Sequence, residues 1–564
     1  MMKTLTRKVL PLLLALMLVL PMAMSAASAE DRPVVTILTN LNTLVTDYQD
    51  NYFTKWVEDE MNVDLEFIFL PADTKAAAEK FNMMVIGQEY LGDIIYWKLG
   101  ATSLPSYDES GAIAPIDEYI AKYDTNMEAY SQKMYGDDTW LKMLTMANGH
   151  IYTTGRTEDA SYNATKYRGW INQAWLDKLN LEMPTTPEEL YYVLKAFKEQ
   201  DPNGNGVADE IPMLGCVKWW SANPLYYLIT PFVQWHDVGG NLLVNDGKVY
   251  AAYATDEYRD AMKFVNRLVK EGLLDDRTWS LSTAQYKAYG AEENPIVGVH
   301  FYTYAAGAMP ATHANIGDYV NLPYMANYKT GERVTSYTPF DPQDNQNLFL
   351  SKTAKDPDLA FRVIDFLFSE EANTRFRFGI EDVHYTVLSE EEAAIAREKM
   401  GVSADMKLIV EGATGWGEAC NMSWQGQGLG TFDENIAVSA WNGDENGYLW
   451  RRYLAVQDQM SIAPALGTYY PSIAVSDDEN RLINENGLSE INSYRGEVLN
   501  DFCLGRQDPN DDEVWNEYID LLYLMGLEEM LDAYQVVYDR YTGAKSAEEL
   551  ADFWDEMHDY WGIE

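Results

Sequence analysis

Three short apolar runs near the start of the chain decide the fold: VVTIL at residues 34–38, VDLEFIFL at residues 63–70 and DIIY at residues 93–96. Each predicts a β-strand, and the second alternates apolar with acidic residues as a half-buried strand does. Residues 51–61 and 75–87, which separate these runs, carry apolar side chains at helical spacing. The order strand, helix, strand, helix, strand predicts a parallel sheet with crossover helices and therefore an α/β fold.

The same alternation continues further along the chain. Residues 186–189 (TPEE) form a helix start, with Thr186 as the N-cap, proline at the first helical position and Glu189 closing the capping box. We expect a helix over residues 256–271 that ends at a glycine, and a buried strand over residues 296–304. A helix is predicted over residues 358–369, and the C-terminal third is predicted to be mostly helical.

Length and composition exclude several classes of protein. A chain of 564 residues is too long for one core, so two or more lobes are expected. The 88 acidic and 42 basic residues give a net charge of −46, which would repel phosphate backbones and excludes nucleic acid as a partner. Aromatic residues make up 13% of the chain, more than cores require, and such rings suit sites that are apolar and wet at once.

The N-terminus indicates the compartment. Lys3, Arg7 and Lys8 precede an apolar run over residues 9–24, and Ala27-Ser28-Ala29 is a small-residue cleavage motif. We expect a signal peptide over residues 1–29, cleaved after Ala29, and a secreted or extracytoplasmic protein with a net charge of −49 once the three basic residues are removed. The leader has no lipobox cysteine. A soluble periplasmic protein, a released protein and a protein anchored by a retained leader all remain open.

Residues 201–210 (DPNGNGVADE) have the pattern of a cation-binding loop. Side chains with oxygen atoms alternate along it, and Gly206 stands at the sixth position, where an EF-hand loop bends sharply. The predicted ligands are Asp201, Asn203, Asn205, the Val207 carbonyl, Asp209 and Glu210, and oxygen donors of this kind favour a structural Ca²⁺. The loop departs from an EF-hand at position twelve, which is Pro212. A solvated Asn-Gly turn without a metal is the alternative.

With its flanking segments, this loop resembles the extracellular solute-binding proteins of ABC sugar importers. The matching segments are WINQAWLDKL at residues 170–179, PTTPEEL at 184–190 and DPNGNGVADEIP at 201–212. They are similar to family 1, in its large lipoprotein-type and alginate-oligosaccharide-binding branch, where the loop binds structural Ca²⁺. DIIY at residues 93–96 and GAIAPID at 111–117 resemble the first-lobe signature shared with maltose-binding protein.

The resemblance implies a two-lobed, type II periplasmic-binding-protein fold, with interleaved lobes joined by a hinge and a ligand cleft between them. Lobe 1 is expected to comprise residues 30–160 and 325–390. Lobe 2 is expected to comprise residues 161–324 and 391–564, including the calcium loop. It further implies a monomer, not an enzyme, that captures an oligosaccharide by lobe closure and delivers it to the permease subunits of an ABC transporter.

Aromatic residues followed by polar ones are the predicted ligand contacts, because a sugar ring needs a flat apolar surface with hydrogen-bonding groups around it. They lie after expected strands or in a glycine-rich stretch. The predicted ligand-binding residues are Trp97, Lys98, Trp219, Trp220, His300, Tyr302, Tyr304, Trp416, Asn421, Trp424 and Gln425. Trp97 also matches a stacking tryptophan of maltose-binding protein, and His300, Tyr302 and Tyr304 lie at a position that resembles another sugar-stacking site. For each tryptophan and for His300, packing in a core is the competing interpretation.

Two other functions fit the same composition. A secreted glycoside hydrolase would also be acidic and aromatic, and would use two carboxylates at a defined separation. A receptor subunit that serves a sugar sensor would share the binding lobes. The acidic charge favours a neutral oligosaccharide over a polyanionic glycan as ligand.

Overall fold

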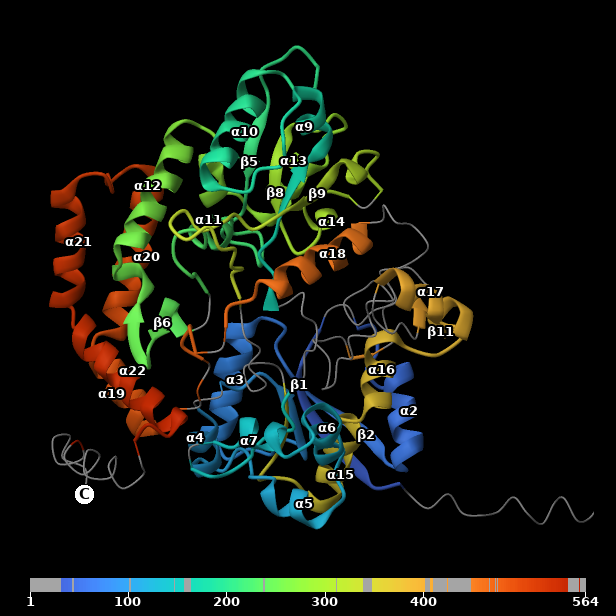
Figure 1. Ribbon diagram of the computed structural model, residues 1–564. Coiled ribbons are helices and arrows are strands. Elements are labelled where there is room, and N and C mark those ends of the chain that lie inside the picture. Colours follow the sequence, from blue (N-terminus) through green and yellow to red (C-terminus); the bar gives the residue numbers. More distant parts are fainter. Residues whose placement is uncertain are drawn as a thin grey trace, which may run out of the picture.

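The computed structural model describes residues 32–42, 45–100, 103–146, 148–156, 164–236, 239–310, 312–337, 347–400, 406–408, 423–424, 448–465, 467–471, 473, 475–545 and 557. Two mixed α/β lobes lie one above the other, and each is built on a four-stranded sheet (Figure 1). The predicted α/β fold class is therefore confirmed.

The sheet of lobe 1, the lower lobe in Figure 1, has the strand order β10-β3-β1-β2. Its strands are β1 (Val34–Asn40), β2 (Asp64–Leu70), β3 (Ile94–Trp97) and β10 (Asn347–Leu350). β1 pairs in parallel with β2 and with β3, whereas β10 runs antiparallel to β3. The helices α2 (Tyr52–Met61) and α3 (Thr74–Ile86) connect the parallel strands, and the side chains of Asn51 and Asp73 cap their first turns. The predicted strand and helix order is confirmed.

Both faces of the lobe 1 sheet are buried. Along β3, Ile94 and Tyr96 belong to one apolar cluster, and Ile95 and Trp97 belong to the cluster on the other face. This division follows from the alternation of side chains in a strand. A sheet covered on both faces leaves its strand ends, and the loops that follow them, as the accessible parts.

The sheet of lobe 2 has the order β5-β8-β4-β9. Its strands are β4 (Gly169–Asn172), β5 (Ile211–Leu214), β8 (Val297–Phe301) and β9 (Tyr319–Leu322). β5 and β8 are parallel neighbours, and β4 runs antiparallel to both β8 and β9. The carboxyl ends of β5 and β8 therefore lie at the same edge of this sheet.

Helices cover lobe 2 and continue down the left side of the molecule (Figure 1). α10 (Pro187–Glu199) begins with the predicted capping box of Thr186 and Glu189. α12 (Asp256–Lys270) ends before Gly272, whose φ of +63° suits the left-handed end of a helix. The C-terminal helices are α19 (Asp477–Glu485), α20 (Leu488–Leu504), α21 (Asp512–Leu524) and α22 (Leu527–Thr542).

Two segments that connect the lobes are tied together. Residues 324–337 lead from lobe 2 toward β10, and α18 (Tyr448–Ser461) lies between the lobes (Figure 1). The Arg333 guanidinium contacts the Asp458 carboxylate at 2.6 and 3.2 Å and donates through Nε to the Tyr324 carbonyl at 2.8 Å. This ion pair fixes one crossing segment against the other.

The predicted division of the chain into lobes remains a prediction, with two points of difference. The segment after Tyr324 packs on lobe 2, where the Ala326 amide donates to the Thr185 carbonyl at 2.7 Å. Trp424 lies in an apolar cluster of lobe 1, although residues 391–564 were assigned to lobe 2. Both positions therefore lie on a different lobe from the one that the sequence pattern suggested.

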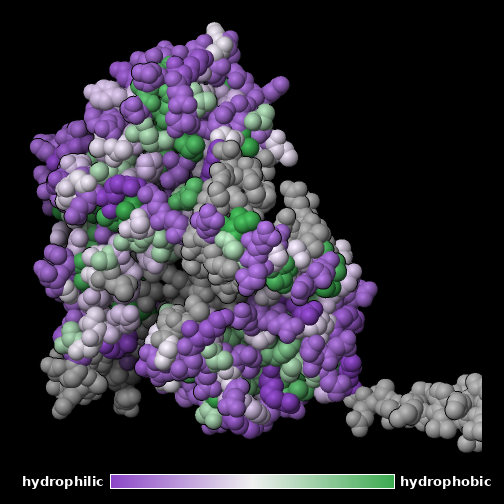
Figure 2. Space-filling view, turned by 45° about the vertical axis from the view of Figure 1, so that its right-hand side comes forward, coloured by the Kyte–Doolittle hydropathy of each residue, from purple (hydrophilic) through white to green (hydrophobic). Residues whose placement is uncertain are grey.

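The face shown in Figure 2 is mostly hydrophilic, with apolar residues in small patches. This agrees with an acidic chain in which the aromatic residues are largely buried. Within the described ranges, no helix combines the length and apolar character that a membrane crossing requires.

Candidate functional site

Aromatic side chains gather where two neighbouring parallel strands of lobe 2 end. β5 leads into Trp219 and Trp220, and β8 leads into Tyr302 and Tyr304. The rings of Trp219 and Tyr302 are stacked with centroids 4.2 Å apart, Trp220 lies edge-on to Tyr302 at 6.1 Å, and Tyr304 lies edge-on to it at 5.4 Å. These four predicted residues form one cluster, the aromatic platform, at the edge of the sheet where open α/β folds bind ligands.

The position of Tyr302, at the centre of the platform, requires a glycine next to it. Gly307 belongs to α14 (Ala305–Ala308), the short turn of helix that follows Tyr304. A Cβ atom added to Gly307 would lie 1.6 Å from Cδ1 of Tyr302. The Tyr302 ring can therefore lie against α14 and stack on Trp219 only because residue 307 has no side chain.

The platform is partly open and has cations at its margins. Trp220 is 48% exposed, and the other three rings are half-buried. The Lys287 ammonium lies 4.8 Å from the centre of the Trp219 ring, and the Arg452 guanidinium of α18 lies 5.7 Å from that of Tyr304. Burial, with a smaller effect of Tyr304, raises the pKa of Tyr302 to about 12, so its hydroxyl stays protonated at neutral pH. Flat apolar rings bordered by hydrogen-bond donors suit an oxygen-rich ring such as a sugar.

Trp97 and Lys98 belong to the other lobe. Trp97 is the last residue of β3, is 8% exposed and packs its ring 5.2 Å from that of Phe81 in α3. Lys98, directly after it, is exposed. The Trp97 ring therefore lies in the core of lobe 1, and Lys98 lies at the carboxyl end of β3.

His300 is buried in the middle of the lobe 2 sheet, below the platform. It pairs with Trp170 of β4, its ring lies 4.7 Å from that of Tyr319, and it is 3% exposed. Neither ring nitrogen has a hydrogen-bond partner among the described residues. Burial lowers the pKa of His300 to about 3, because the charged ring would be cut off from water. His300 is thus a neutral core residue and not an exposed ligand contact.

This burial predicts a pH-dependent loss of stability. Between pH 6.5 and about 3 the unfolded chain binds a proton at His300 that the folded protein does not, so stability falls as the pH falls through this window. Replacing His300 by leucine should remove about 1.4 kcal/mol of this loss per pH unit. Urea unfolding of the protein and the H300L variant at pH 7.5, 6, 5 and 4 measures it. Parallel stability curves for the two proteins would contradict the prediction.

The glycine-rich stretch that contains the remaining predicted residues is described only at Ser423 and Trp424. Trp424 is 1% exposed and lies among the rings of Phe53, Phe67 and Tyr96. Its indole N–H donates to the Thr54 hydroxyl at 2.8 Å. Trp424 is therefore a core residue of lobe 1, where it was expected in a binding wall. Trp416, Asn421 and Gln425 lie outside the described residues.

The predicted cation loop lies between α10 and β5 and bends at two glycines. Gly204 and Gly206 both have φ of +75°, so the sharp bend expected at Gly206 is confirmed. Their amides donate to the Asp201 carboxylate at 2.9 and 3.1 Å. The Lys178 ammonium of α9 (Gln173–Leu179) donates to the Pro202 carbonyl at 2.9 Å and holds the start of the loop against lobe 2.

The donor groups of this loop fit a cation in their chemistry. The amide groups of Asn203 and Asn205 turn toward Asp209 and donate to its carboxylate at 3.0 to 3.1 Å. Oε1 of Glu210 is buried without a hydrogen-bond partner among the described residues. Burial and the charges of Asp201 and Asp209 raise the pKa of Glu210. A cation would satisfy that oxygen and relieve the repulsion among the three carboxylates.

In the part of the chain that the structure describes, no three His, Cys, Asp or Glu side chains are grouped so that they alone could hold a metal ion. The loop is not of that kind, because two amides and a carbonyl complete its expected ligand set. Cys216 and Cys503 are buried free thiols, and Cys420 lies outside the described residues.

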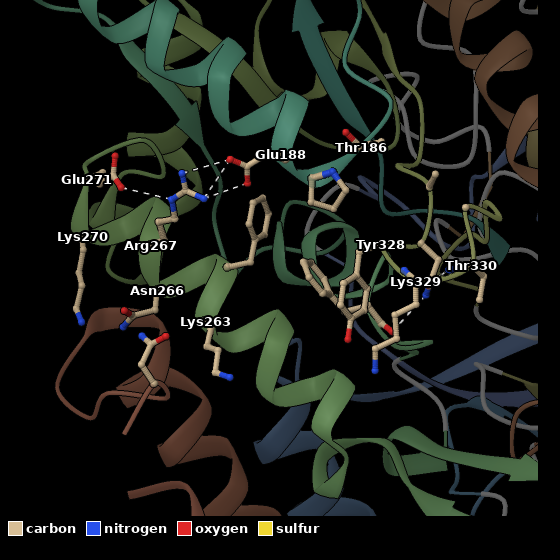
Figure 3. Close-up of a pocket in the computed structure, with 17 residues that line it drawn as sticks. Thr186, Glu188, Lys263, Asn266, Arg267, Lys270, Glu271, Tyr328, Lys329 and Thr330 are labelled. Atoms are coloured by element: carbon tan, nitrogen blue, oxygen red, sulfur yellow. Dashed lines mark hydrogen bonds and ion pairs between the residues drawn. The ribbon is translucent and has the colours of Figure 1, made fainter. Parts of the chain in front are cut away.

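A wide hollow on lobe 2, here the outer pocket, has a volume of about 1010 Å³ but none of the predicted residues lines it. It lies between the start of α10, the helix α12 and residues 326–331. In Figure 3 the Arg267 guanidinium lies between the carboxylates of Glu188 and Glu271. The nitrogen–oxygen distances of these two ion pairs are 3.0 and 3.5 Å. The three lysines around it also have carboxylate partners: Lys263 with Asp260, Lys270 with Asp508 and Lys329 with Glu257. The charged side chains that line this pocket are therefore paired within the protein.

Comparison with known proteins finds relatives that match part of the chain. No protein-family model matches the chain. The chain is 31% identical over 256 residues to the fructooligosaccharide ABC transporter substrate-binding protein FusA of Streptococcus pneumoniae. The matched segment covers 43% of this chain and 45% of FusA. The chain is 30% identical over 200 residues to the lipoprotein LipO of Bacillus subtilis, covering 35% and 36% of the two chains. The chain thus matches less than half the length of each of these relatives.

Solved structures show the fold. An extracellular solute-binding protein from Bifidobacterium longum subsp. infantis superposes with a TM-score of 0.72 at 23% identity, over 91% of this chain and 99% of the other. FusA in complex with kestose gives a TM-score of 0.70 at 23% identity, over 91% and 100%. A second FusA structure, with the same TM-score and 22% identity over the same shares, is of an EF-hand mutant. The chain has the two-lobed fold of the extracellular solute-binding proteins, and the resemblance stated from its sequence is confirmed.

The sequence interpretation missed several residues around the platform. Lys287, Arg452 and Gly307 contact its rings, but they come from separate helices. No local motif marks them. Gly307 lies only three residues after Tyr304 in a run of small residues, AAGA, and this was the one available signal.

Proposed function

We propose that the protein is an extracytoplasmic solute-binding protein that captures a carbohydrate between its lobes and delivers it to the permease subunits of an ABC transporter. It acts as a secreted monomer, released from its signal peptide after Ala29. The ligand lies on the aromatic platform of lobe 2, and lobe 1 closes over it by a hinge motion.

The aromatic platform is the observation that carries this proposal. Four rings from the ends of β5 and β8 meet at one edge of the lobe 2 sheet, and Trp220 is 48% exposed. Tyr302 lies against α14, Tyr304 lies next to Arg452 of α18, and α18 lies between the two lobes (Figure 1). The names of the relatives point the same way, because FusA is a fructooligosaccharide transporter's substrate-binding protein.

A thermal-shift panel tests the proposal. The purified protein is heated in the presence of neutral and acidic oligosaccharides, including kestose, and in the presence of peptides and polyols. We expect at least one carbohydrate to raise the melting temperature, since a ligand at 100 times its dissociation constant stabilises the folded state by about 2.7 kcal/mol. Stabilisation by no carbohydrate, or by peptides alone, would overturn the proposal.

The proposal includes no catalytic step. In keeping with this, FusA is named as a substrate-binding protein. Incubation with each stabilising oligosaccharide, followed by an assay of reducing ends, should show no increase over a blank. Turnover would instead favour a secreted glycoside hydrolase.

The loop over residues 201–210 is proposed to hold a structural Ca²⁺ through Asp201, Asn203, Asn205, the Val207 carbonyl, Asp209 and Glu210. The orphaned Glu210 oxygen and the close carboxylates support this, as does the EF-hand named for FusA. A bound ion would brace the connection from α10 to β5, the strand that leads to the platform.

Chelation should therefore destabilise the protein. We expect EGTA to remove about 2.7 kcal/mol of stability if the Ca²⁺ concentration before chelation is 100 times the dissociation constant. The D209N variant should melt as the chelated protein does and should not respond to EGTA. D532N, which changes an exposed aspartate on α22, is the matched control and should respond as the unmodified protein does. Differential scanning calorimetry measures the effect, and unchanged melting after chelation would exclude the site.

A further inference from the structure

A fully buried arginine stands where the chain first enters lobe 2. Thr153 still forms a β-bridge with Phe349 of the lobe 1 sheet, and Gly169 begins β4 of the lobe 2 sheet. Arg168, the residue directly before β4, is 0% exposed. Burying a charged side chain is costly unless polar contacts offset the loss of water, so the contacts of Arg168 indicate what it does.

Arg168 and the start of β4 hold the backbone of the aromatic platform. The Arg168 guanidinium donates through Nη1 to the Thr303 carbonyl at 3.0 Å, and the Arg168 carbonyl accepts from the Tyr302 amide at 3.1 Å. The Trp170 indole donates to the Tyr302 carbonyl at 2.8 Å. Thr303 stands between Tyr302 and Tyr304, which are two of the four platform rings. These three hydrogen bonds therefore fix the short piece of backbone that carries both rings.

The same guanidinium also contacts the segment that leads into β4. Its Nη2 donates to the Thr165 hydroxyl at 2.7 Å, and Thr165 is 0% exposed. The guanidinium is planar and rigid, and hydrogen bonds from a charged donor are stronger than neutral ones. Arg168 thus ties the Thr303 carbonyl of the platform to the segment over residues 164–168, by which the chain arrives from lobe 1.

Further contacts join this first crossing segment to the other two. The Tyr324 hydroxyl donates to the Tyr167 carbonyl at 2.8 Å, so residues 164–168 are held against residues 324–337. Arg333 of that second segment is paired with Asp458 of α18, which lies between the lobes (Figure 1). α18 also carries Arg452, whose guanidinium lies over a ring of the platform. The platform is therefore linked with each of these three crossing segments.

We propose that Arg168 is a positioning residue of the carbohydrate site, which holds the platform in its ligand-binding arrangement and ties that arrangement to the crossing segments. The inference rests on the proposed function and adds to it a residue that is too deeply buried to touch the ligand. Hinge closure changes the backbone angles of the segments that connect the lobes. Arg168 would pass such a change at residues 164–168 to the Thr303 carbonyl, and so to the rings on either side of it.

Replacing Arg168 by methionine tests the inference, because methionine fills similar space without a donor. Titration calorimetry is done on the full mature protein, with the carbohydrate of the thermal-shift panel that raises the melting temperature most. We expect R168M to raise its dissociation constant about tenfold, the size of effect typical for one hydrogen bond from a charged group. R168K should recover part of this loss, since lysine keeps the charge and can still donate to the Thr303 carbonyl.

Two more variants separate positioning from a general loss of stability. T165V keeps the shape of Thr165 but removes the hydroxyl that accepts from Arg168, and it should weaken binding about threefold. Y518F is the matched control, because the buried Tyr518 hydroxyl donates to the Tyr253 carbonyl at 3.0 Å among the C-terminal helices. It should lower the melting temperature and leave the dissociation constant unchanged. If R168M yields no folded protein, T165V and R168K decide the question, and both should bind more weakly than the unmodified protein.

The outcomes separate this inference from the proposed function. Unchanged affinity in the Arg168 and Thr165 variants, no recovery in R168K relative to R168M, or an equal loss of affinity in Y518F would each overturn the role of Arg168. If binding in those cases still depends on Trp220, the proposed function stands. If no carbohydrate binds, both are overturned.

Discussion

Replacing Trp424 by alanine should lower the free energy of unfolding by about 3–5 kcal/mol, the range for large aromatic residues in cores. The ring is 1% exposed and lies within 6.2 Å, centroid to centroid, of Phe53, Phe67, Tyr96 and Phe376. Truncation would leave a cavity between α2 and the lobe 1 sheet and would remove the hydrogen bond to Thr54. Chemical denaturation monitored by fluorescence and circular dichroism measures the change.

Two further variants sharpen this result. Trp424→Phe keeps most of the ring but loses the indole N–H, so it should cost clearly less than alanine. Trp220→Ala makes the same truncation at a site that is 48% exposed, and it should leave stability within about 1 kcal/mol of the unmodified protein. If W424A were no less stable than W220A, the placement of Trp424 in the core would be wrong.

Ligand affinity should depend on Trp220, the tryptophan whose truncation should have little effect on stability. Trp220→Ala should weaken the binding of the oligosaccharide identified by the thermal-shift panel by about 2 kcal/mol, which is roughly thirtyfold in the dissociation constant. Trp220 presents an exposed ring next to Tyr302 and contributes little to the core, so this loss would reflect lost ligand contact. Titration calorimetry measures the dissociation constant.

Tyr523→Ala is the matched control for this prediction. Tyr523 is 52% exposed on α21, on the C-terminal helices, and its removal should leave the dissociation constant unchanged. Gly307→Ala should mimic the loss seen in W220A, since the new methyl group would displace the Tyr302 ring. Full affinity in W220A would place the ligand elsewhere on the molecule.

The sequence predicts the fold in detail where the information is local. The strands β1 to β3, the capping box at Thr186 and the helix end at Gly272 all follow from periodicity, capping chemistry and glycine conformation. The platform can also be inferred from the sequence, because neighbouring parallel strands place the residues that follow them at one edge of the sheet. Trp219, Trp220, Tyr302 and Tyr304 are brought together for this reason.

The remaining site residues depend on contacts that no local pattern encodes. The residues next to Trp97 and Trp424 in the sequence do not distinguish them from exposed ligand-binding tryptophans, because their burial depends on tertiary contacts such as those with Phe81 of α3 and Thr54 of α2. His300 lies on a strand that the sequence predicts to be buried, and in the structure β5 and β4 flank this strand while the Tyr319 ring lies 4.7 Å from the His300 ring.

The position of Trp424 has a consequence for how the chain is made. Its partner Thr54 lies 370 residues earlier, and the lobe 1 sheet is complete only when β10 has joined β3. In the nascent chain, lobe 1 therefore has an unfilled cavity at the Trp424 position until most of the protein has been synthesised. Contacts between such distant residues slow folding and prolong the time in which apolar surface is open to aggregation. A truncated chain that ends before residue 424 would carry this defect permanently, even with every strand of the first sheet in place.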